Sequence, residues 1–291
     1  MLTFAQYSSI HKLEIHTSKS AVSKAIKDLR KETKTVGFVP TMGALHAGHM
    51  SLIKIAAELT DIVVCSIFVN PTQFTNPTDL EKYPRPIEAD LALLKTSSCQ
   101  VLFLPEVSEI YPEKENWNFE LNYLENILEG KFRPGHYQGV TQVVKKLLDI
   151  VEPDFMFLGQ KDYQQVMVLD YMTSTLELPV EVVMCPIVRE DDGLALSSRN
   201  IHLSASDREK AAVLSRTLFG AKKDFERKTL SELKEEAWIT LNTVDGVTPE
   251  YFEICDARTL LPAQSKECLS LVALVAASVG QTRLIDNIIL K

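Results

Sequence analysis

The 291-residue chain has few of the features that mark membrane proteins, disulfide-rich secreted proteins or general nucleic-acid binders. Its five cysteines are scattered and form no Cys-x-x-Cys pair, so they indicate neither a disulfide framework nor a zinc site. The longest apolar run, residues 269–279, is shorter than the ~20 residues that cross a bilayer, and no signal-peptide core is seen. The net charge of −8 argues against broad nucleic-acid binding. We therefore expect a cytoplasmic protein whose partners are neither membranes nor nucleic acids.

Two common phosphate-binding patterns are also missing. There is no G-x-G-x-x-G, and although Gly43 and Gly48 have the spacing of P-loop glycines, His49 and Met50 follow where a P-loop has Lys and Ser/Thr. Cations that face a phosphate must then be imidazoles of this loop, together with Lys or Arg from elsewhere in the chain.

An anion site is nevertheless expected in the same stretch. The apolar run 36–39, closed by Pro40, is typical of a strand, and helical spacing begins after His49, so the loop 41–48 leads into a helix N-terminus. Unpaired N–H groups at such a terminus favour phosphate. His46 and His49 would place both rings on one face. A lone histidine would more often be a cap or surface residue, but two that flank a glycine at this junction favour a site.

Strand-like and helix-like runs alternate along the first two thirds of the chain. The segment 61–69 is β-branched and apolar, as are strands buried on both faces of a parallel sheet. The expected fold class is α/β, with a Rossmann-like doubly wound parallel sheet in residues 1–187 and a smaller α+β C-terminal lid domain in residues 188–291.

The remaining elements are predicted from periodicity and from capping boxes. Further strands are expected at residues 101–104, 154–158, 180–188, 251–256, 269–277 and 283–289. Helices are expected at 20–32, at 86–96, through residues 143–151, at 206–227 after a capping box at Ser206–Glu209, and after a second box at Thr229–Glu232, whereas 106–117 is loop-like.

Polar side chains follow several of these strands, at the edge where open parallel sheets bind ligands. For Asn70 a turn role and a ligand role are equally favoured, whereas Gln73 favours ligand contact. Lys161 is the best candidate for a phosphate-binding cation, and Gln165 shares its helix face. Residues 197–199, Ser-Ser-Arg, could clamp a polyphosphate if they fold over the site.

Five other polar residues have no assigned role. Lys131, Arg133 and His136 could meet an anion or belong to a solvated loop. Glu88 and Asp90 could lie near a metal ion, although a charge pair at a helix N-terminus is the favoured interpretation.

The sequence His-Ala-Gly-His at residues 46–49 resembles the HIGH signature of nucleotidylyl transferases, and residues 197–199 resemble their mobile KMSKS loop. A set of blocks in the right order resembles the pantoate-β-alanine ligase family within that superfamily. The blocks are residues 39–49, 68–74, 135–140, 158–165 and 196–200, and the C-terminal third is similar too, at residues 251–256 and 282–287.

The resemblance implies an ATP-dependent, AMP-forming ligase. Pantoate and ATP would give pantoyl adenylate and diphosphate in the N-terminal ATP- and pantoate-binding domain, and the amine of β-alanine would then displace AMP to give pantothenate. Mg²⁺ would accompany the ATP, and the family implies a homodimer.

The resemblance also implies roles for individual residues. His49 would be a proton donor and His46 would lie beside the phosphates, and a protonated His could neutralise the leaving diphosphate. Gln73 and Gln165 would bind pantoate, and Gln73 would border β-alanine. The implied catalytic residues are His46, His49, Lys161 and Arg199, with no direct metal ligand. The implied ATP-binding residues are Met42, Gly43, Ala44, Leu45, His46, Ala47, Gly48, His49, Gly159, Gln160, Lys161, Asp162, Val188, Leu196, Ser197, Ser198 and Arg199.

Two alternatives stay open at this point. A nucleotidylyltransferase of the same fold would keep the nucleotide in its product, and a regulatory nucleotide-binding module would not turn over. Product analysis separates these functions.

Overall fold

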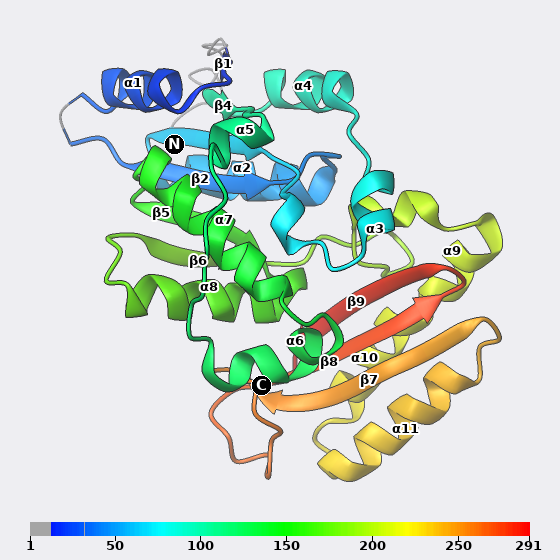
Figure 1. Ribbon diagram of the computed structural model, residues 1–291. Helices are drawn as coiled ribbons and strands as arrows, with labels where there is room; N and C mark the ends of the chain where they lie inside the picture. The colour runs from blue at the N-terminus through cyan, green and yellow to red at the C-terminus, as the bar shows by residue number, and fades with distance from the viewer. Residues whose placement is uncertain (1–12, 32) are drawn as a thin grey trace, which may run out of the picture.

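The computed structural model describes residues 13–31 and 33–291. Its larger sheet is parallel, with the strand order β1-β4-β3-β2-β5-β6, and a second, antiparallel sheet has the order β7-β8-β9 (Figure 1). The strands are β1 Glu14–His16, β2 Val36–Thr41, β3 Ile62–Ile67, β4 Val101–Phe103, β5 Phe155–Gly159, β6 Glu181–Cys185, β7 Val247–Asp256, β8 Leu271–Val279 and β9 Thr282–Ile289. The predicted fold class is confirmed, whereas the domain boundary at 187/188 stays a prediction.

Helices cover both faces of the parallel sheet because its strands are apolar on both sides. Val36 and Phe38 of β2 pack into the core that contains α1, α7 and α8, and Val39 packs into the core that contains α2 and α4. The helices are α1 Lys19–Leu29, α2 Ala47–Leu59, α3 Pro77–Lys82, α4 Ile87–Lys95, α5 Val107–Ile110, α6 Leu128–Phe132, α7 His136–Val151, α8 Tyr163–Thr175, α9 Ala205–Ala211, α10 Val213–Asp224 and α11 Leu230–Asn242. The 3₁₀ turns are η2 Pro71–Gln73, η3 Asn122–Asn126, η4 Gln160–Asp162 and η5 Ser198–His202.

Pro40 does not end its strand, as the sequence had suggested. It lies opposite Ser66 in the β2–β3 pair, and β2 continues to Thr41. A proline lacks the N–H that a strand ladder uses. Since β5 pairs with β2 only at Gly37 and Phe38, Pro40 lies where one neighbouring strand has already diverged.

Three predicted helix boundaries need comment. The predicted capping box at Ser206–Glu209 is wrong, because Ser204 is the N-cap and accepts a hydrogen bond from the N–H of Asp207. The predicted single helix is also divided at Ala212 into α9 and α10. The box at Thr229–Glu232 is confirmed as the start of α11. The loop predicted at 106–117 contains the short helix α5, and Glu32, the predicted end of the first helix, lies outside the described residues.

The antiparallel sheet packs between two cores. One face contributes Phe252 and Ala273 to a core with α10 and α11, and the other contributes Tyr251 and Leu274 to the core of the parallel sheet. Strand β9 is an edge strand of this sheet (Figure 1) and contacts η4, which follows β5, and η5, which comes after β6. The C-terminal sheet can therefore influence segments that follow the parallel strands.

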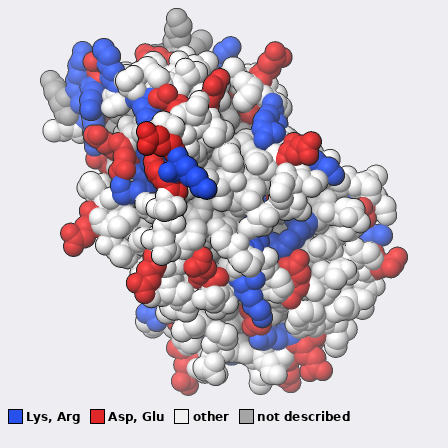
Figure 2. All heavy atoms as spheres, in the orientation of Figure 1, with Lys and Arg blue, Asp and Glu red and all other residues white. Residues whose placement is uncertain are grey.

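Charged side chains of both signs are interspersed over most of the face shown in Figure 2. Within the described ranges, no helix has the length and apolar character needed to cross a membrane.

Candidate active site

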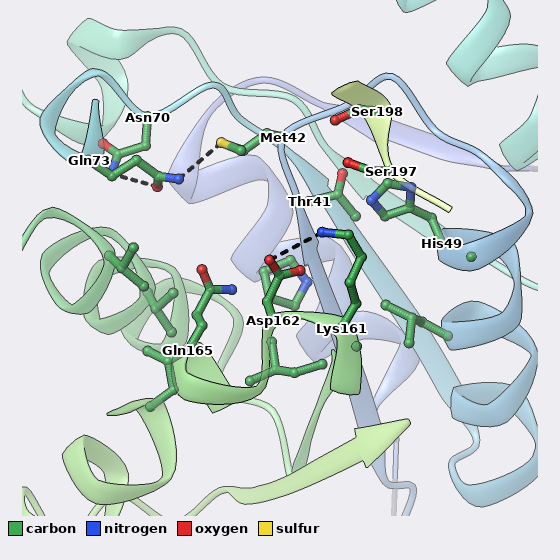
Figure 3. Close-up of a pocket in the computed structure, with 18 of the residues that line it drawn as sticks. Thr41, Met42, His49, Asn70, Gln73, Lys161, Asp162, Gln165, Ser197 and Ser198 are labelled. Atoms are coloured by element: carbon green, nitrogen blue, oxygen red, sulfur yellow. Dashed lines mark hydrogen bonds and ion pairs between the residues drawn. The ribbon is translucent and has the colours of Figure 1, made fainter. Parts of the chain in front are cut away.

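A cleft opens beyond the carboxyl ends of the parallel strands. Its empty space, including its solvent-open mouth, is about 1410 Å³. The lining comes from the β2–α2 loop, the segment after β3, the β5–α8 junction, helix α7 and residues 186–188 and 196–199 (Figure 3). This is where ligands bind in open parallel sheets.

Most of the predicted site residues meet in this cleft. The predicted residues that line it are Met42, His46, Gly48, His49, Gln73, Gly159, Lys161, Asp162, Gln165, Val188, Leu196, Ser197, Ser198 and Arg199. Five of the predicted ATP-binding residues are not among its lining residues: Gly43, Ala44, Leu45, Ala47 and Gln160.

The two histidines of the β2–α2 loop cap their own helix. His46 is the N-cap of α2, and its Nδ1 accepts a hydrogen bond from the N–H of Gly48 at 3.1 Å. The Nδ1 of His49 accepts from the backbone N–H of His46 at 3.3 Å, and the two ring centroids are 4.1 Å apart. Because Nδ1 is an acceptor in both rings, the proton of each neutral imidazole is on Nε2. Each ring can therefore donate one N–H to a ligand.

These imidazoles are not cations in the free protein, which differs from the interpretation of His46 and His49 as protonated groups. Burial lowers the pKa of His46 to about 4 and that of His49 to about 3, and the charge of Lys161 acts in the same direction on both. At neutral pH the free protein therefore presents both rings as hydrogen-bond donors without charge.

Asp90 of α4 fixes the loop that leads to these histidines. Its carboxylate accepts the N–H of Ala44 at 2.9 Å and that of Leu45 at 2.7 Å. The loop adopts positive φ at Gly43 (81°) and also at Ala44 (49°), a conformation that is uncommon for a non-glycine residue. Asp90 is only 1% exposed, and burial raises its pKa. It is thus bonded to the loop, whereas Glu88 on the same helix is exposed.

Gln73 is oriented by Asn70, as Figure 3 shows. The amide of Asn70 donates to Oε1 of Gln73 at 3.1 Å and to the carbonyl of Gly139 at 3.0 Å, and accepts from the hydroxyl of Tyr111 at 2.8 Å. The Nε2 of Gln73 is 3.1 Å from Sδ of Met42, at the cleft wall. Asn70 also caps η2, so it acts both as the turn residue and as the support of Gln73.

His136 supports the same segment from α7. Its Nδ1 lies 2.9 Å from the carbonyl oxygen of Gln73 and its Nε2 lies 3.0 Å from Nη1 of Arg133, so the proton is on Nδ1. Burial, followed by the charge of Arg133, lowers the pKa of His136 to about 4. His136 and Arg133 line the cleft, whereas Lys131 is exposed and is not one of its lining residues.

The β5–α8 junction contributes the cation. Lys161 lies in η4, and its Nζ is 3.6 Å from a carboxylate oxygen of Asp162 (Figure 3). The lysine side chain is only 16% exposed. A Cβ added at Gly159 would meet no atom within 4 Å, so this glycine leaves open space in the cleft wall. Lys161 and Gln165 both face the cleft, as their spacing had suggested.

The segment 197–199 faces the cleft from the other side. The hydroxyl of Ser198 lies 3.2 Å from that of Tyr83, and Nη2 of Arg199 lies 3.1 Å from a carboxylate oxygen of Asp79. The hydroxyl of Ser197 accepts the N–H of Arg199 and caps η5. The segment is therefore linked to the chain around α3, across the mouth of the cleft.

Sequence reasoning missed several residues around the cleft. Tyr83 gave no signal, because an aromatic residue before a proline reads as a loop residue. Asp286 and Asn287 in β9 did give a signal, since two polar residues interrupt an apolar strand and are nevertheless buried. In the described part of the chain, no group of three or more His, Cys, Asp or Glu side chains is arranged to hold a metal ion.

Comparisons with known proteins agree on one family. The family model for pantoate-beta-alanine ligase matches residues 14–289. The chain is 44% identical to the pantothenate synthetase of Bacteroides thetaiotaomicron, over 94% of this chain and 97% of the relative. The crystal structure of pantothenate synthetase from Thermus thermophilus superposes with a TM-score of 0.90 at 39% identity, over 94% of this chain and 98% of that one. A pantoate-beta-alanine ligase from Francisella tularensis, complexed with beta-gamma ATP and beta-alanine, gives a TM-score of 0.80 at 37% identity, over 95% of this chain and 97% of that one.

Proposed function

The chain belongs to the pantoate-beta-alanine ligase family, and from this membership we propose how its cleft carries out the reaction. It is an ATP-dependent ligase that joins pantoate and β-alanine to give pantothenate. A carboxylate oxygen of pantoate attacks the α-phosphorus of ATP and diphosphate leaves. The amine of β-alanine then attacks the acyl carbon of the adenylate, AMP leaves, and the amine proton is lost.

The observation that carries the proposal is the convergence of Lys161, His46, His49 and the segment 197–199 on one cleft. We propose that Lys161 and Arg199 supply the positive charge that stabilises the leaving diphosphate. The Nε2–H groups of His46 and His49 would donate neutral hydrogen bonds to phosphate oxygens. Donors fixed in advance stabilise developing charge without reorganisation, and adenylation depends mainly on such positioning.

The nucleotide would occupy the side of the cleft between the β2–α2 loop and the β5–α8 junction. Gly159 leaves space in that wall, and Val188 is also one of the lining residues. Gly43, Ala44 and Leu45 would then act through the shape of the loop, because Asp90 already occupies two of their N–H groups.

Pantoate would bind between Gln73 and Gln165. The Oε1 of Gln73 is held by Asn70, so its Nε2–H₂ group is the part free to turn toward a substrate oxygen. Amides suit this task because they orient a hydroxyl or carboxylate without competing as nucleophiles. β-Alanine would approach beside Gln73, where Arg133 and His136 complete the wall.

We also propose that Mg²⁺ enters with the phosphates of ATP and keeps several water ligands, as Mg²⁺ commonly does. Asp162 brings a carboxylate to the cleft lining, and this side chain is 48% exposed, so it could hold a metal-bound water. Bound there, the ion would neutralise phosphate charge. A homodimer in the cytoplasm is the assembly and location that the family resemblance supports.

The test is the pantoate-dependent exchange of labelled diphosphate into ATP, with Mg²⁺ present and β-alanine absent. We expect exchange, because the adenylate step is reversible and needs no amine. Addition of β-alanine should then release AMP and pantothenate in equal amounts. Protein that binds ATP but catalyses no exchange with pantoate would refute the proposed first step.

A further inference from the structure

Asp286 and Asn287 form a buried polar pair in β9, outside the mechanism described above. Their neighbours Ile285, Ile288 and Ile289 are apolar, yet the two polar residues are only 3% and 1% exposed. Polar groups this deeply buried require hydrogen-bond partners. The partners here belong to the turn that contains Lys161 and to the segment that precedes Arg199.

Asn287 holds the turn that contains Lys161. Its Nδ2 donates to the carbonyl of Gln160 at 2.8 Å and to that of Lys161 at 3.0 Å, while its Oδ1 accepts from Nε2 of Gln160 at 3.0 Å. The whole side-chain amide is therefore used to fix η4. This explains why Gln160 does not line the cleft.

Asp286 holds the base of a short hairpin, residues 189–195, which precedes Arg199 and is closed by an antiparallel bridge between Arg189 and Ala195. Its two carboxylate oxygens accept from Nη1 and Nη2 of Arg189 at 2.6 and 2.9 Å. The same guanidinium donates to the carbonyl of Asn287 at 3.1 Å and to that of Gly193, inside the hairpin, at 3.0 Å. Arg189 thus ties β9 to the hairpin, which ends where the segment 197–199 enters the cleft.

From these contacts we propose that Asp286 and Asn287 are positioning residues for the triphosphate of ATP. Neither side chain reaches the phosphates; one fixes the turn of Lys161 and the other fixes the hairpin before Arg199. Both supports come from adjacent residues of one strand, so the spacing between the two cations depends on β9. The inference rests on the proposed roles of Lys161 and Arg199 in the ligase reaction.

The chain offers a closely matched control. Asp192, near the tip of the same hairpin, accepts from both Nη atoms of Arg208 at 2.5 and 3.0 Å, but this ion pair is exposed. Asp286→Asn and Asp192→Asn thus each remove one negative charge from a bidentate aspartate–arginine pair, and both pairs involve the same hairpin. Only the pair of Asp286 connects the hairpin to β9, the strand that also supports the turn of Lys161. Asn287→Asp keeps the size of its side chain but replaces the donor of two bonds with an oxygen.

The experiment measures the affinity of each variant for ATP and for AMP by calorimetry, together with diphosphate exchange. We expect Asp286→Asn and Asn287→Asp to weaken ATP binding by about tenfold, the effect of losing one charge-assisted contact, with AMP binding nearly unchanged. Exchange should fall by ~10² because misplaced groups slow the chemical step. Asp192→Asn should match the wild type in all three measurements.

Equal losses of ATP and AMP affinity in both buried variants would indicate a merely structural role and overturn the inference. So would variants that match Asp192→Asn. Circular dichroism shows whether each variant is folded, and if one buried variant does not fold, the other decides. The two nucleotide affinities test this inference even if the wild type proves unable to exchange diphosphate, which would count against the proposed reaction instead.

Discussion

Two sets of residues are proposed to face the triphosphate, and they hold their functional groups in different ways. The first set, His46 and His49, consists of neutral donors fixed by backbone N–H groups within three residues of each ring. The second set, Lys161 and Arg199, carries charge on segments supported by β9, through contacts between residues 97 to 127 positions apart.

The two sets of residues differ in whether they contribute a fixed hydrogen-bond geometry or a positive charge. Neutral imidazoles can be buried with a small desolvation penalty, whereas cations need partners and fixed surroundings when water is excluded. In the proposed mechanism the two histidines therefore supply direction, and Lys161 and Arg199 supply most of the electrostatic stabilisation. Substitutions in the two sets of residues should therefore differ in the size of their effect on activity and in which replacement side chains restore it.

The largest effect is expected for Lys161→Ala. Removing the cation should lower pantoate-dependent diphosphate exchange by ~10³, the upper range for loss of one group that stabilises a transition state. Lys24→Ala, which breaks an exposed ion pair on α1, is the control and should retain full activity. Exchange within a few-fold of the wild type in the Lys161 variant would contradict the proposed role.

A smaller loss of exchange activity, about 10²-fold, is expected for His49→Ala, because the proposed contribution of the ring is a hydrogen bond and not a charge. Glutamine can place its amide nitrogen near the position of Nε2, and asparagine near that of Nδ1. His49→Gln should thus retain more exchange activity than His49→Asn, measured at saturating ATP. The reverse order would mean that the other ring nitrogen faces the ligand.

Asp90→Asn should have a more moderate effect through the histidine loop. The asparagine amide turns a donor toward the N–H of Ala44 or Leu45, so one buried N–H loses its partner at a cost of about 1–3 kcal/mol. We expect lower stability in urea and about tenfold slower exchange, since the loop that carries His46 and His49 is less well fixed. Glu88→Gln, an exposed change on the same helix, should alter neither quantity.

The difference between the two sets of residues also explains which parts of the site could be predicted from the sequence. The histidine loop was found because strand, glycine, histidine and helix are adjacent in sequence, and Gln73, Lys161 and Gln165 follow strands whose apolar composition is visible locally. The hydrogen bond from Leu45 to Asp90 joins residues 45 positions apart, and that from Asn287 to Gln160 joins residues 127 positions apart. No local sequence pattern therefore indicates which residues these two side chains contact. Tertiary packing decides such contacts.

Errors in the predicted fold have similarly physical causes. Pro40 read as a strand end, but a neighbouring strand had diverged, so the missing N–H was tolerated. Ser206 and Ser204 both precede an acidic residue at a plausible spacing, and only the backbone decides which is the cap. The three-residue strand β1 is too short to show a periodic pattern.

The smallest expected effect on the reaction is that of substituting His136, because this histidine supports the Gln73 segment, whereas His46 and His49 are proposed to face the ligand. In the folded protein its pKa is about 4, whereas an unfolded chain takes up this proton near pH 6.5. The stability contributed by neutral His136 is therefore complete above pH 6.5 and is lost as the pH falls toward 4.

His136→Asn can keep a donor near the carbonyl of Gln73 but does not titrate. Its unfolding free energy, from urea titrations between about pH 7 and 4.5, should fall less steeply than that of the wild type, by up to ~1.4 kcal/mol per pH unit. Equal slopes in the wild type and in His136→Asn would show that burial does not hold His136 neutral.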